Sequence, residues 1–259
     1  DIHANIQALD ACLAHARAQQ AQRFVFLGDM VGYGADPSPV IDRIMLLTEE
    51  GAMALLGNHD AMALTPPAEM KTVGDSTAAW THRQLSDVQR QWLSSLPLTL
   101  QQGQTLFVHA SADIPERWRY VYDARAAAAS LDAAAQEWAD VHYVFGGHVH
   151  LQTLYYRGVG DGLMPFMPQS GVAVPVPRHR QWVGTVGSVG QPRDGDWRAS
   201  WALYDGDRIA FRRVEYDVQS TAAKLQRQAV RHHQRVKRPL PDKRLRQRQM
   251  RNSKLRWNK

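Results

Sequence analysis

The chain has 259 residues, of which 44% are hydrophobic and 22% charged, so it is long enough for one sizeable domain and a smaller extension. No apolar run approaches the roughly 18 residues that cross a bilayer, and the first residues are neither basic nor apolar, so we expect neither a membrane span nor a secretory signal. The single cysteine, Cys12, excludes an internal disulfide, and together these features lead us to expect a cytoplasmic protein.

Positive charge is concentrated at the end of the chain. Residues 224–259 contain fourteen Lys and Arg residues and one acid, Asp242, for a net charge of +13. The remaining 17 basic and 24 acidic residues give −7, and the two parts together return the +6 of the whole chain. We therefore expect a mildly acidic folded domain over residues 1–216 and a basic tail over residues 217–259.

Helices and short strands alternate along the first 150 residues. A helix is predicted where apolar residues recur at helical spacing, as Ile6, Leu9 and Leu13 do. A buried strand is predicted where a short apolar run stops at a glycine or a polar residue. In chain order, the pattern predicts a helix over residues 5–20, a strand over 23–27, a helix over 39–50, a strand over 52–56, two helices over 77–96, a strand over 105–108, a helix over 123–139 and a strand over 141–145.

Capping signals and turns refine these boundaries. Ser38 is a candidate N-cap, with Pro39 at the first helical position. Ser86 and Gln89 fit a capping box, which divides residues 77–96 into two helices. After residue 150 the pattern becomes β-rich, with Asp205-Gly206 as a hairpin turn. The expected strands there span residues 153–156, 181–186, 199–204 and 208–216.

Metal-capable side chains follow each of the four predicted strands. Asp29 follows the first and Asn58 the second, while His109 follows the third, and His148 and His150 follow the fourth. Because ligands collect beyond the carboxyl ends of strands in open α/β sheets, we expect these side chains to converge at one edge. Carboxylate, imidazole and amide oxygen without a thiolate suit divalent ions such as manganese, iron, zinc or cobalt.

The motifs and their order resemble the calcineurin-like metallophosphoesterase family. Each short motif is weak alone, but five stand in the family's order and four of them follow predicted strands. The resemblance covers residues 1 to about 150, and residues 187–193 extend it. The matching segments are Asp1-Ile2-His3, Gly28-Asp29, Gly57-Asn58-His59-Asp60, Val108-His109 and Gly147-His148-Val149-His150. The resemblance implies a four-layer αββα fold, in which two mixed β-sheets pack as a sandwich flanked by helices.

The resemblance also implies a dinuclear metal site and a catalytic domain over residues 1–216. One ion would be held by Asp1, His3, Asp29 and His150, and the other by Asn58, His109, His148 and the bridging Asp29. His59 would protonate the leaving oxygen or stabilise charge on the phosphorus oxygens, and Asp60 would orient it. The nucleophile would be a hydroxide that bridges two divalent ions, for which we favour manganese, with iron, zinc, cobalt or nickel as alternatives.

Departures from the family pattern narrow the substrate. Protein serine/threonine phosphatases of this superfamily carry an arginine after the second motif, where this chain has Gly32-Tyr33-Gly34. This favours the smaller bacterial-type phosphodiesterases and phosphatases, which act on small phosphorylated substrates. The substrate's charge would then be met by the metals, His59 and an arginine. The candidate substrate contacts are Asn5, which is equally well explained as a brace for the first loop, Tyr33, which packing also explains, and Arg117, Arg119 and Arg193.

The first motif departs from the family in its setting. In the family a buried strand precedes the first aspartate, whereas no strand precedes Asp1 in this sequence. In a chain that lacks this strand, we expect Asp1 to be tethered only through its own chain and the first ion to bind more weakly.

The basic tail and the fold leave alternative functions open. A segment of charge +13 is able to bind nucleic acid through phosphate contacts, but its low apolar content favours a solvated or disordered end over a specific nucleic-acid module. A non-catalytic binding or scaffold protein on the same fold is the second alternative. The complete ligand motifs favour a phosphoesterase of small or nucleotide-like substrates, with phosphodiesters slightly ahead of monoesters.

Overall fold

The computed structural model describes residues 1–158 and 162–236. It consists of two compact units, Asp1–Val218 and a second unit that begins at Gln219. All residues of the helix α7 (Val218–Val236) except the first, Val218, make up the described part of the second unit. The expectation of helix or disorder for the rest of the basic tail falls on residues outside the described range.

A mixed sheet with six strands among the described residues forms the centre of the first unit. Its order is β3-β4-β5-β9-β6-β7, with β4, β5 and β9 parallel to one another. Side chains alternate between its faces, as a pleated strand requires, so that Tyr143 and Phe145 point to one side and Val144 to the other. The strands span Thr99–Gln102 (β3), Thr105–Val108 (β4), Tyr143–Gly146 (β5), Gln152–Arg157 (β6), Leu163–Phe166 (β7) and Trp182–Val186 (β9).

A second strand layer faces this sheet and is divided into two parts. One part is a short parallel pair and the other is an antiparallel sheet of order β10-β11-β8. Phe211 of this layer packs with Tyr143, Phe145 and Trp182 of the large sheet, and all four side chains are buried. The strands span Val25–Phe26 (β1), Met53–Ala54 (β2), Ala173–Pro175 (β8), Ala199–Tyr204 (β10) and Arg208–Val214 (β11). The two layers therefore share one apolar core.

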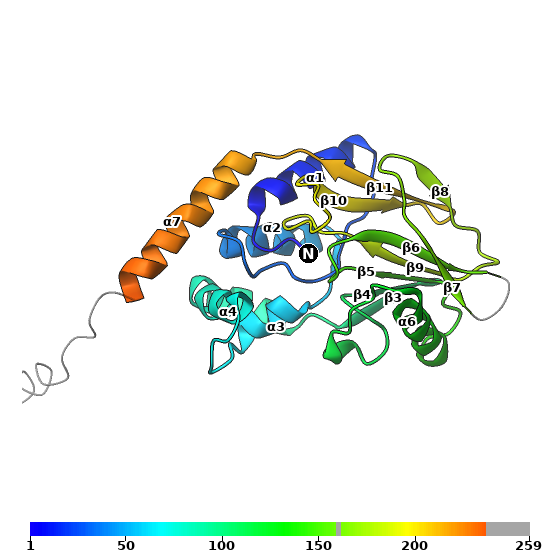
Figure 1. The fold of residues 1–259 in the computed structure, drawn as a ribbon, viewed down its shortest axis with the longest axis horizontal. Coiled ribbons are helices and arrows are strands. Elements are labelled where there is room, and N and C mark those ends of the chain that lie inside the picture. Colours follow the sequence, from blue (N-terminus) through cyan, green and yellow to red (C-terminus); the bar gives the residue numbers. More distant parts are fainter. Residues whose placement is uncertain (159–161, 237–259) are drawn as a thin grey trace, which may run out of the picture. The chain divides into compact units, whose positions relative to one another are not determined.

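Helices cover both outer faces of this sandwich (Figure 1). The alanine-rich α6 (Ala124–Glu137) packs on the large sheet, where Ala127 and Leu131 meet Val144. On the other side, α1 (Ile6–Ala18) contacts β10 and β11, and it shares a core with α2 (Pro37–Glu49) and β2. The predicted mixed α/β sandwich is confirmed, with the second layer split into two sheets.

Local sequence explains most helix boundaries, with some corrections. Ser86 caps α5 (Asp87–Ser94) through the predicted box, because its Oγ accepts from the Gln89 N–H and its own N–H donates to Gln89. The preceding α4 (Val73–Gln84) begins four residues earlier than the predicted residue 77. In α2 the first helical residue is Pro37 and the N-cap is Asp36, so the predicted cap at Ser38 is wrong.

Three strands and one helix were absent from the sequence-based expectation. The edge strands β7 and β8 each contain a proline, Pro165 and Pro175, which reads as a strand breaker in a sequence but is tolerated at a sheet edge. The strand β3 also lies at an edge, and its second half is exposed. The helix is α3 (Asn58–Leu64), which begins inside the third motif.

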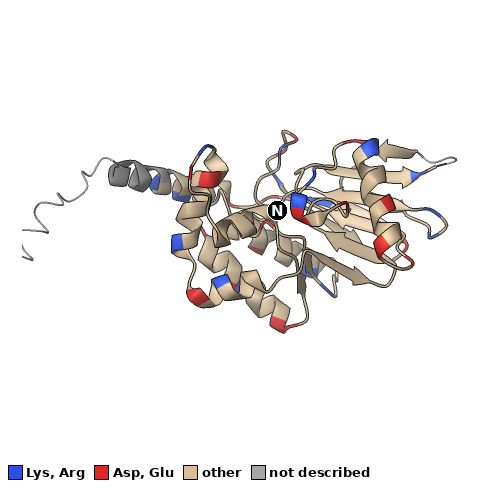
Figure 2. Ribbon diagram, turned by 90° about the horizontal axis from the view of Figure 1, so that it is seen from below, with Lys and Arg blue, Asp and Glu red and all other residues tan. Residues whose placement is uncertain are grey.

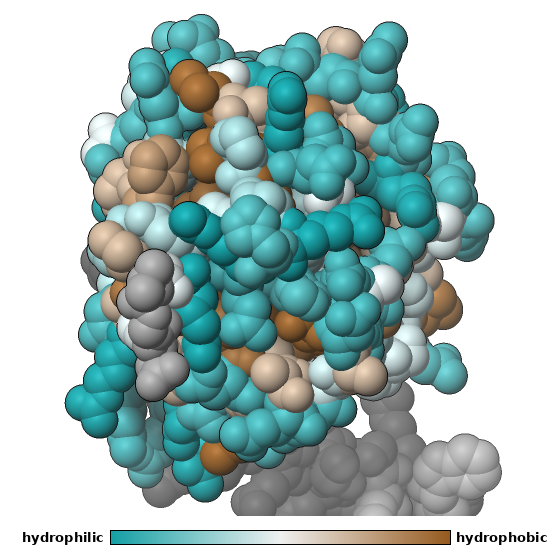
Figure 3. All heavy atoms as spheres, turned by 90° about the vertical axis from the view of Figure 1, so that its right-hand side faces the viewer, coloured by the Kyte–Doolittle hydropathy of each residue, from teal (hydrophilic) through white to brown (hydrophobic). Residues whose placement is uncertain are grey.

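Charged and other hydrophilic residues are spread over the parts of the molecule that Figures 2 and 3 show. Figure 2 shows acidic and basic residues interspersed over helices and loops of the first unit. The end that carries β7 and β8, seen in Figure 3, is mainly hydrophilic with scattered hydrophobic residues. No helix in the described ranges is long and apolar enough to cross a membrane.

Candidate metal centre

The predicted ligands lie where the strands end. Asp29 follows β1 and Asn58 follows β2, while His109 follows β4, and His148 and His150 follow β5. Parallel pairing of β1 with β2 and of β4 with β5 brings these carboxyl ends to one side. The segment with Asp1 and His3 runs beside them, because the N–H groups of Ile2 and His3 both donate to the carbonyl of Asp29, at 2.8 and 3.0 Å.

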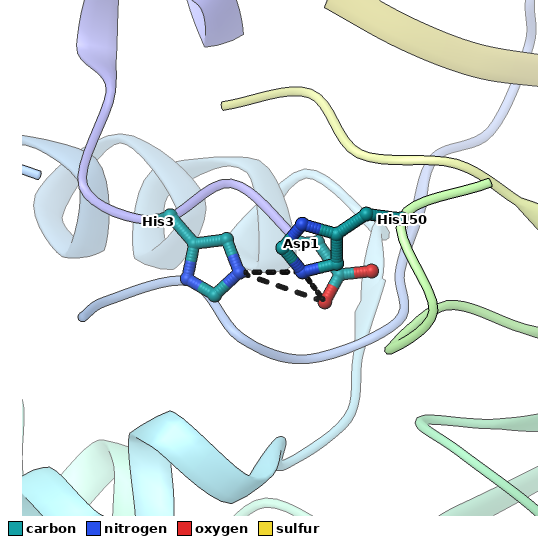
Figure 4. A group of neighbouring side chains, drawn as sticks. All are labelled: Asp1, His3 and His150. Atoms are coloured by element: carbon teal, nitrogen blue, oxygen red, sulfur yellow. Dashed lines mark hydrogen bonds and ion pairs between the residues drawn. The ribbon is translucent and has the colours of Figure 1, made fainter. Parts of the chain in front are cut away.

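The first group consists of Asp1, His3 and His150. All three side chains are buried and point toward one another (Figure 4). The two Nε2 atoms of His3 and His150 are 3.0 Å apart, and Asp1 Oδ1 lies 3.8 Å from the former and 3.4 Å from the latter. Asp1 Oδ1 has no hydrogen-bond partner among the described residues. Buried polar atoms are normally paired, so this arrangement points to a bound cation.

The second group consists of Asp29, His109 and His148, with Asn58 beside them. His109 Nε2 lies 3.2 Å from His148 Nδ1 and 3.0 Å from Asn58 Oδ1. Asp29 connects the two groups, because its Oδ2 is 3.5 Å from His109 Nε2 and 3.8 Å from His3 Nε2. One carboxylate oxygen thus faces a histidine of each group, which is the arrangement that two neighbouring cations require.

Each carboxylate is held by a peptide N–H through its other oxygen. The His59 N–H donates to Asp29 Oδ1 and the His148 N–H donates to Asp1 Oδ2, both at 2.7 Å. These bonds fix the orientation of the carboxylates and leave Asp29 Oδ2 and Asp1 Oδ1 directed at the histidines.

Backbone carbonyls orient three of the histidine rings. The Nδ1 atoms of His3, His109 and His150 lie 3.2, 2.8 and 2.6 Å from the carbonyls of Val31, Leu27 and Gln191. A proton on Nδ1 donates to the carbonyl in each case, so the lone pair of Nε2 is directed into the site. Metal-binding histidines in proteins are oriented in this way.

Burial keeps the imidazoles of His3, His148 and His150 in the neutral form that binds metals. Desolvation lowers the pKa of His148 and of His150 to about 3, with His109 adding to the effect at His148 and Arg193 at His150. Desolvation, followed by the proximity of His150, also lowers the pKa of His3 well below its usual value. At Asp29 burial raises the pKa, but the neighbouring His109 and His59 and the hydrogen bond from the His59 N–H lower it, and the net direction is downward. Neutral imidazoles around an ionised carboxylate fit divalent cations.

The ligand segments adopt a strained backbone. His3, Asp29, His148 and His150 have φ values of 50°, 51°, 64° and 60°, in the left-handed region that non-glycine residues rarely adopt. Such strain costs roughly 1 kcal/mol or more per residue and persists only where the surroundings enforce it, as at ligand sites. Two glycines enclose the first segment: a Cβ on Gly34 would lie 2.0 Å from the His3 carbonyl oxygen, and one on Gly190 1.8 Å from that of Ile2.

Asp1 is better supported than the sequence led us to expect. We expected it to be tethered only through its own chain, but its carbonyl accepts from the N–H groups of Val189 and Gly190 at 2.9 and 3.1 Å and from Ser188 Oγ at 2.9 Å. Its backbone nitrogen also donates to the Gly28 carbonyl. The loop 187–191 therefore holds the backbone of Asp1 in position.

His59 lies beside the first group, but Asp60 does not orient its ring. The His59 ring is 5.2 Å from that of His3 and 4.4 Å from that of Tyr33, and its Nδ1 has no hydrogen-bond partner among the described residues. Asp60 instead accepts from the N–H groups of Val31 and Gly57, both at 3.0 Å. Burial, followed by the charge of Asp29, raises the pKa of Asp60 to about 7. Asp60 thus braces the ligand loops at the start of α3.

The predicted substrate contacts divide into near and distant groups. Tyr33 and Arg193 lie near the first group, since the Tyr33 ring is 4.9 Å from that of His3 and the Arg193 charge acts on both Tyr33 and His150. Asn5 caps α1 through Ala8 N and donates to the Gly190 carbonyl, which favours its role as a brace. Arg117 is exposed in the turn Pro115–Arg117, and Arg119 pairs with Asp113.

Two aromatic residues at the site were missed from the sequence. Tyr120 stacks on His148 with ring centroids 3.9 Å apart, and the Trp118 ring lies 5.6 Å from that of His109. The only sequence signal is the cluster of aromatic residues at positions 118, 120 and 122 in a segment without periodicity.

The fold and the site together define a metal-dependent phosphoric ester hydrolase. The model of the calcineurin-like phosphoesterase family matches residues 1–152, more than half of the chain, so the chain belongs to this family. It is also similar to a solved metallophosphoesterase of Sphaerobacter thermophilus, with 32% identity and a TM-score of 0.74 over 88% of this chain and 92% of that one. A hypothetical protein of Pyrococcus horikoshii OT3 shares the fold, with 18% identity and a TM-score of 0.68 over 88% and 91% of the two chains.

Two curated relatives extend the comparison. An uncharacterized protein of Methanocaldococcus jannaschii is 27% identical over 87% of this chain and 89% of its own length. A symmetrical bis(5'-nucleosyl)-tetraphosphatase of Janthinobacterium is 36% identical, over 40% of this chain and 36% of its own length.

Proposed function

We propose that this chain hydrolyses esters of phosphoric acid in small or nucleotide-like substrates, with phosphodiesters ahead of monoesters, using two divalent ions. The observation that carries the proposal is the position of Asp29 Oδ2, 3.5 Å from a histidine of one group and 3.8 Å from a histidine of the other. The catalytic domain spans residues 1–216, and we propose a cytoplasmic location on the basis of the single cysteine, Cys12, which is buried.

The side chains of the two groups would hold the ions. Asp1, His3, His150 and Asp29 would ligate one, and Asn58, His109, His148 and Asp29 the other. Oxygen and nitrogen donors without thiolate suit manganese, iron, zinc, cobalt or nickel, and we propose manganese among these. When bound, the ions supply an activated water and neutralise charge on the phosphate. The carbonyls that orient the histidines and the N–H groups that hold the carboxylates keep this ligand set in place before substrate arrives.

His59, Tyr33 and Arg193 would act on the substrate. Desolvation lowers the pKa of His59, so near neutral pH its imidazole is neutral and offers one N–H to a phosphoryl oxygen or to the leaving oxygen. Arg193 is exposed beside Tyr33 and supplies the positive charge that the segment Gly32-Tyr33-Gly34 lacks. The partial similarity to a bis(5'-nucleosyl)-tetraphosphatase supports nucleotide-like substrates.

Hydrolysis of bis(p-nitrophenyl) phosphate with added Mn²⁺ tests the proposal. We expect turnover by the wild type and a loss of at least 100-fold in His59→Ala and Asp29→Ala, in the range for a general acid or a metal ligand. His179→Ala changes an exposed histidine away from both groups and serves as the matched control. No turnover with any divalent metal would refute the proposal and favour a scaffold protein.

A further inference from the structure

A cavity of about 460 Å³ lies beside the second group of predicted ligands. Part of its lining comes from α3 and its C-cap, through Asn58, Ala61, Met62 and Thr65, which recur at helical spacing. The rest of the lining is Trp118, Tyr120 and His148. Because Asn58 and His148 belong to both the cavity and the second group, the cavity opens directly onto the candidate metal centre.

The aromatic wall continues outward from the site. Tyr120 stacks on His148 with ring centroids 3.9 Å apart and an angle of 23°, and Tyr122 lies nearly parallel to Tyr120 at 5.3 Å. Tyr120 and Tyr122 are 43% and 65% exposed, although large aromatic side chains are usually more buried than this. Because Tyr120 and Tyr122 are exposed, they do not contribute to the core of the fold. Their stacked rings begin at His148, a predicted metal ligand, and are therefore available to bind a ligand.

The chemistry of the lining selects the kind of ligand. The volume is within the range of small-molecule sites, roughly 300–1,000 Å³. Among the described residues that line it, none is Lys or Arg, so the cavity is not suited to a second phosphate group. Aromatic faces, the Met62 thioether and the Thr65 hydroxyl favour a planar ring system with a few polar edges.

We propose that this cavity binds the base of a nucleotide ester, in contact with Trp118, Tyr120 and Met62 of its lining. The phosphate of the same molecule then lies at Asn58 and His148, so this inference rests on the proposed function and names its substrate class. Stacking of a base on aromatic side chains contributes about 1–3 kcal/mol, which corresponds to roughly 5- to 150-fold in affinity.

A nucleotide and its sugar phosphate, which has a hydroxyl group where the nucleotide has the base, test the proposal. Adenosine 5'-monophosphate and ribose 5-phosphate are compared as competitive inhibitors of bis(p-nitrophenyl) phosphate hydrolysis by the manganese-loaded protein. We expect the nucleotide to bind at least fivefold more tightly in the wild type. A change that a variant causes at the metal centre alters both inhibition constants by the same factor. The ratio of the two constants therefore reports only on the base.

Two variants of the cavity lining, one in α3 and one in the aromatic segment, locate the effect. Ala61→Phe fills the cavity from α3, and Tyr120→Leu removes an aromatic ring from the lining; we expect both to bring the ratio close to one. Tyr120→Phe keeps the ring and retains the ratio, as does the control Phe166→Leu, which removes a ring of similar exposure, 42%, from β7. Because Tyr120 stacks on His148, Tyr120→Leu is able to weaken metal binding as well. If Tyr120→Leu loses metal, the result of Ala61→Phe decides the test.

A measurement without catalysis completes the test. In saturation-transfer NMR with free adenosine, we expect the base protons to receive more magnetisation than the ribose protons, and Ala61→Phe to abolish this difference. Normal turnover with equal inhibition by the two phosphates, or a ratio that Ala61→Phe leaves unchanged, would overturn the base site alone. Absence of turnover and of inhibition by inorganic phosphate with every divalent metal would overturn the proposed function, and the base site with it.

Discussion

Ser188 offers a direct test of how Asp1 is held. Its side chain is fully buried in the loop 187–191, where Oγ donates to the Asp1 carbonyl and accepts from the Gln191 N–H, both at 2.9 Å. In Ser188→Ala the Asp1 carbonyl keeps two N–H donors, so losing that bond costs about 1 kcal/mol. The Gln191 N–H is left unpaired, which costs a further 1–3 kcal/mol or so. We therefore expect the variant to lose about 2–4 kcal/mol of unfolding free energy.

Urea unfolding of the metal-free protein, followed by circular dichroism, measures this loss. Ser94→Ala is the matched control, because Ser94 is exposed at the end of α5 and donates only to the Gln91 carbonyl. We also expect Ser188→Ala to weaken the binding of the first group's ion more than that of the second group's ion, because the Gln191 carbonyl orients the ring of His150. A change below about 0.5 kcal/mol, the level of ordinary surface substitutions, would refute the reasoning.

Three further predictions concern other parts of the fold. Phe211→Ala opens the core between the strand layers and should cost about 3–5 kcal/mol in urea unfolding, and a smaller loss than 2 kcal/mol would show that the layers close over the cavity. Burial raises the pKa of the Cys12 thiol to about 12 from an ordinary 9.0, so we expect iodoacetamide to alkylate the folded protein about a thousandfold more slowly than the unfolded chain, with equal rates by mass spectrometry as the contrary result. Burial likewise raises the pKa of Tyr204 from 10.0 to about 12, so the stability that the protonated phenol contributes is complete below pH 10 and lost as the pH rises through 12. The free energy of unfolding of Tyr204→Phe should therefore fall less steeply with pH between 10 and 12 than that of the wild type, and an unchanged slope would contradict the assignment.

Sequence patterns located the elements whose contacts are local. The apolar runs of β4 and β10 gave the boundaries found in the structure, because each strand is bounded by turn residues. The helix α3 was missed because it begins with the polar residues of the third motif. It is stabilised instead by contacts that the sequence does not display, such as that of Asp60 with the Val31 N–H, 29 residues away. Similarly, β7 and β8 form at edges that only the assembled sheets define.

In the candidate site, too, the sequence predicted some features and not the long-range contacts. The order of the motifs predicted which side chains meet, and the structure brings Asp29 between the histidines of both groups. The contacts around them are long-range and were not predictable. The loop that supports Asp1 lies 187 residues away at Ser188, and the stacking of Tyr120 on His148 depends on how one loop turns back on the site.

One residue belongs to both groups in different ways. The ring of His148 faces the second group, while its peptide N–H holds the Asp1 carboxylate of the first. A displacement of this short segment therefore changes the geometry of both groups at the same time. Binding of either ion should therefore strengthen binding of the other, by the same factor whichever ion binds first.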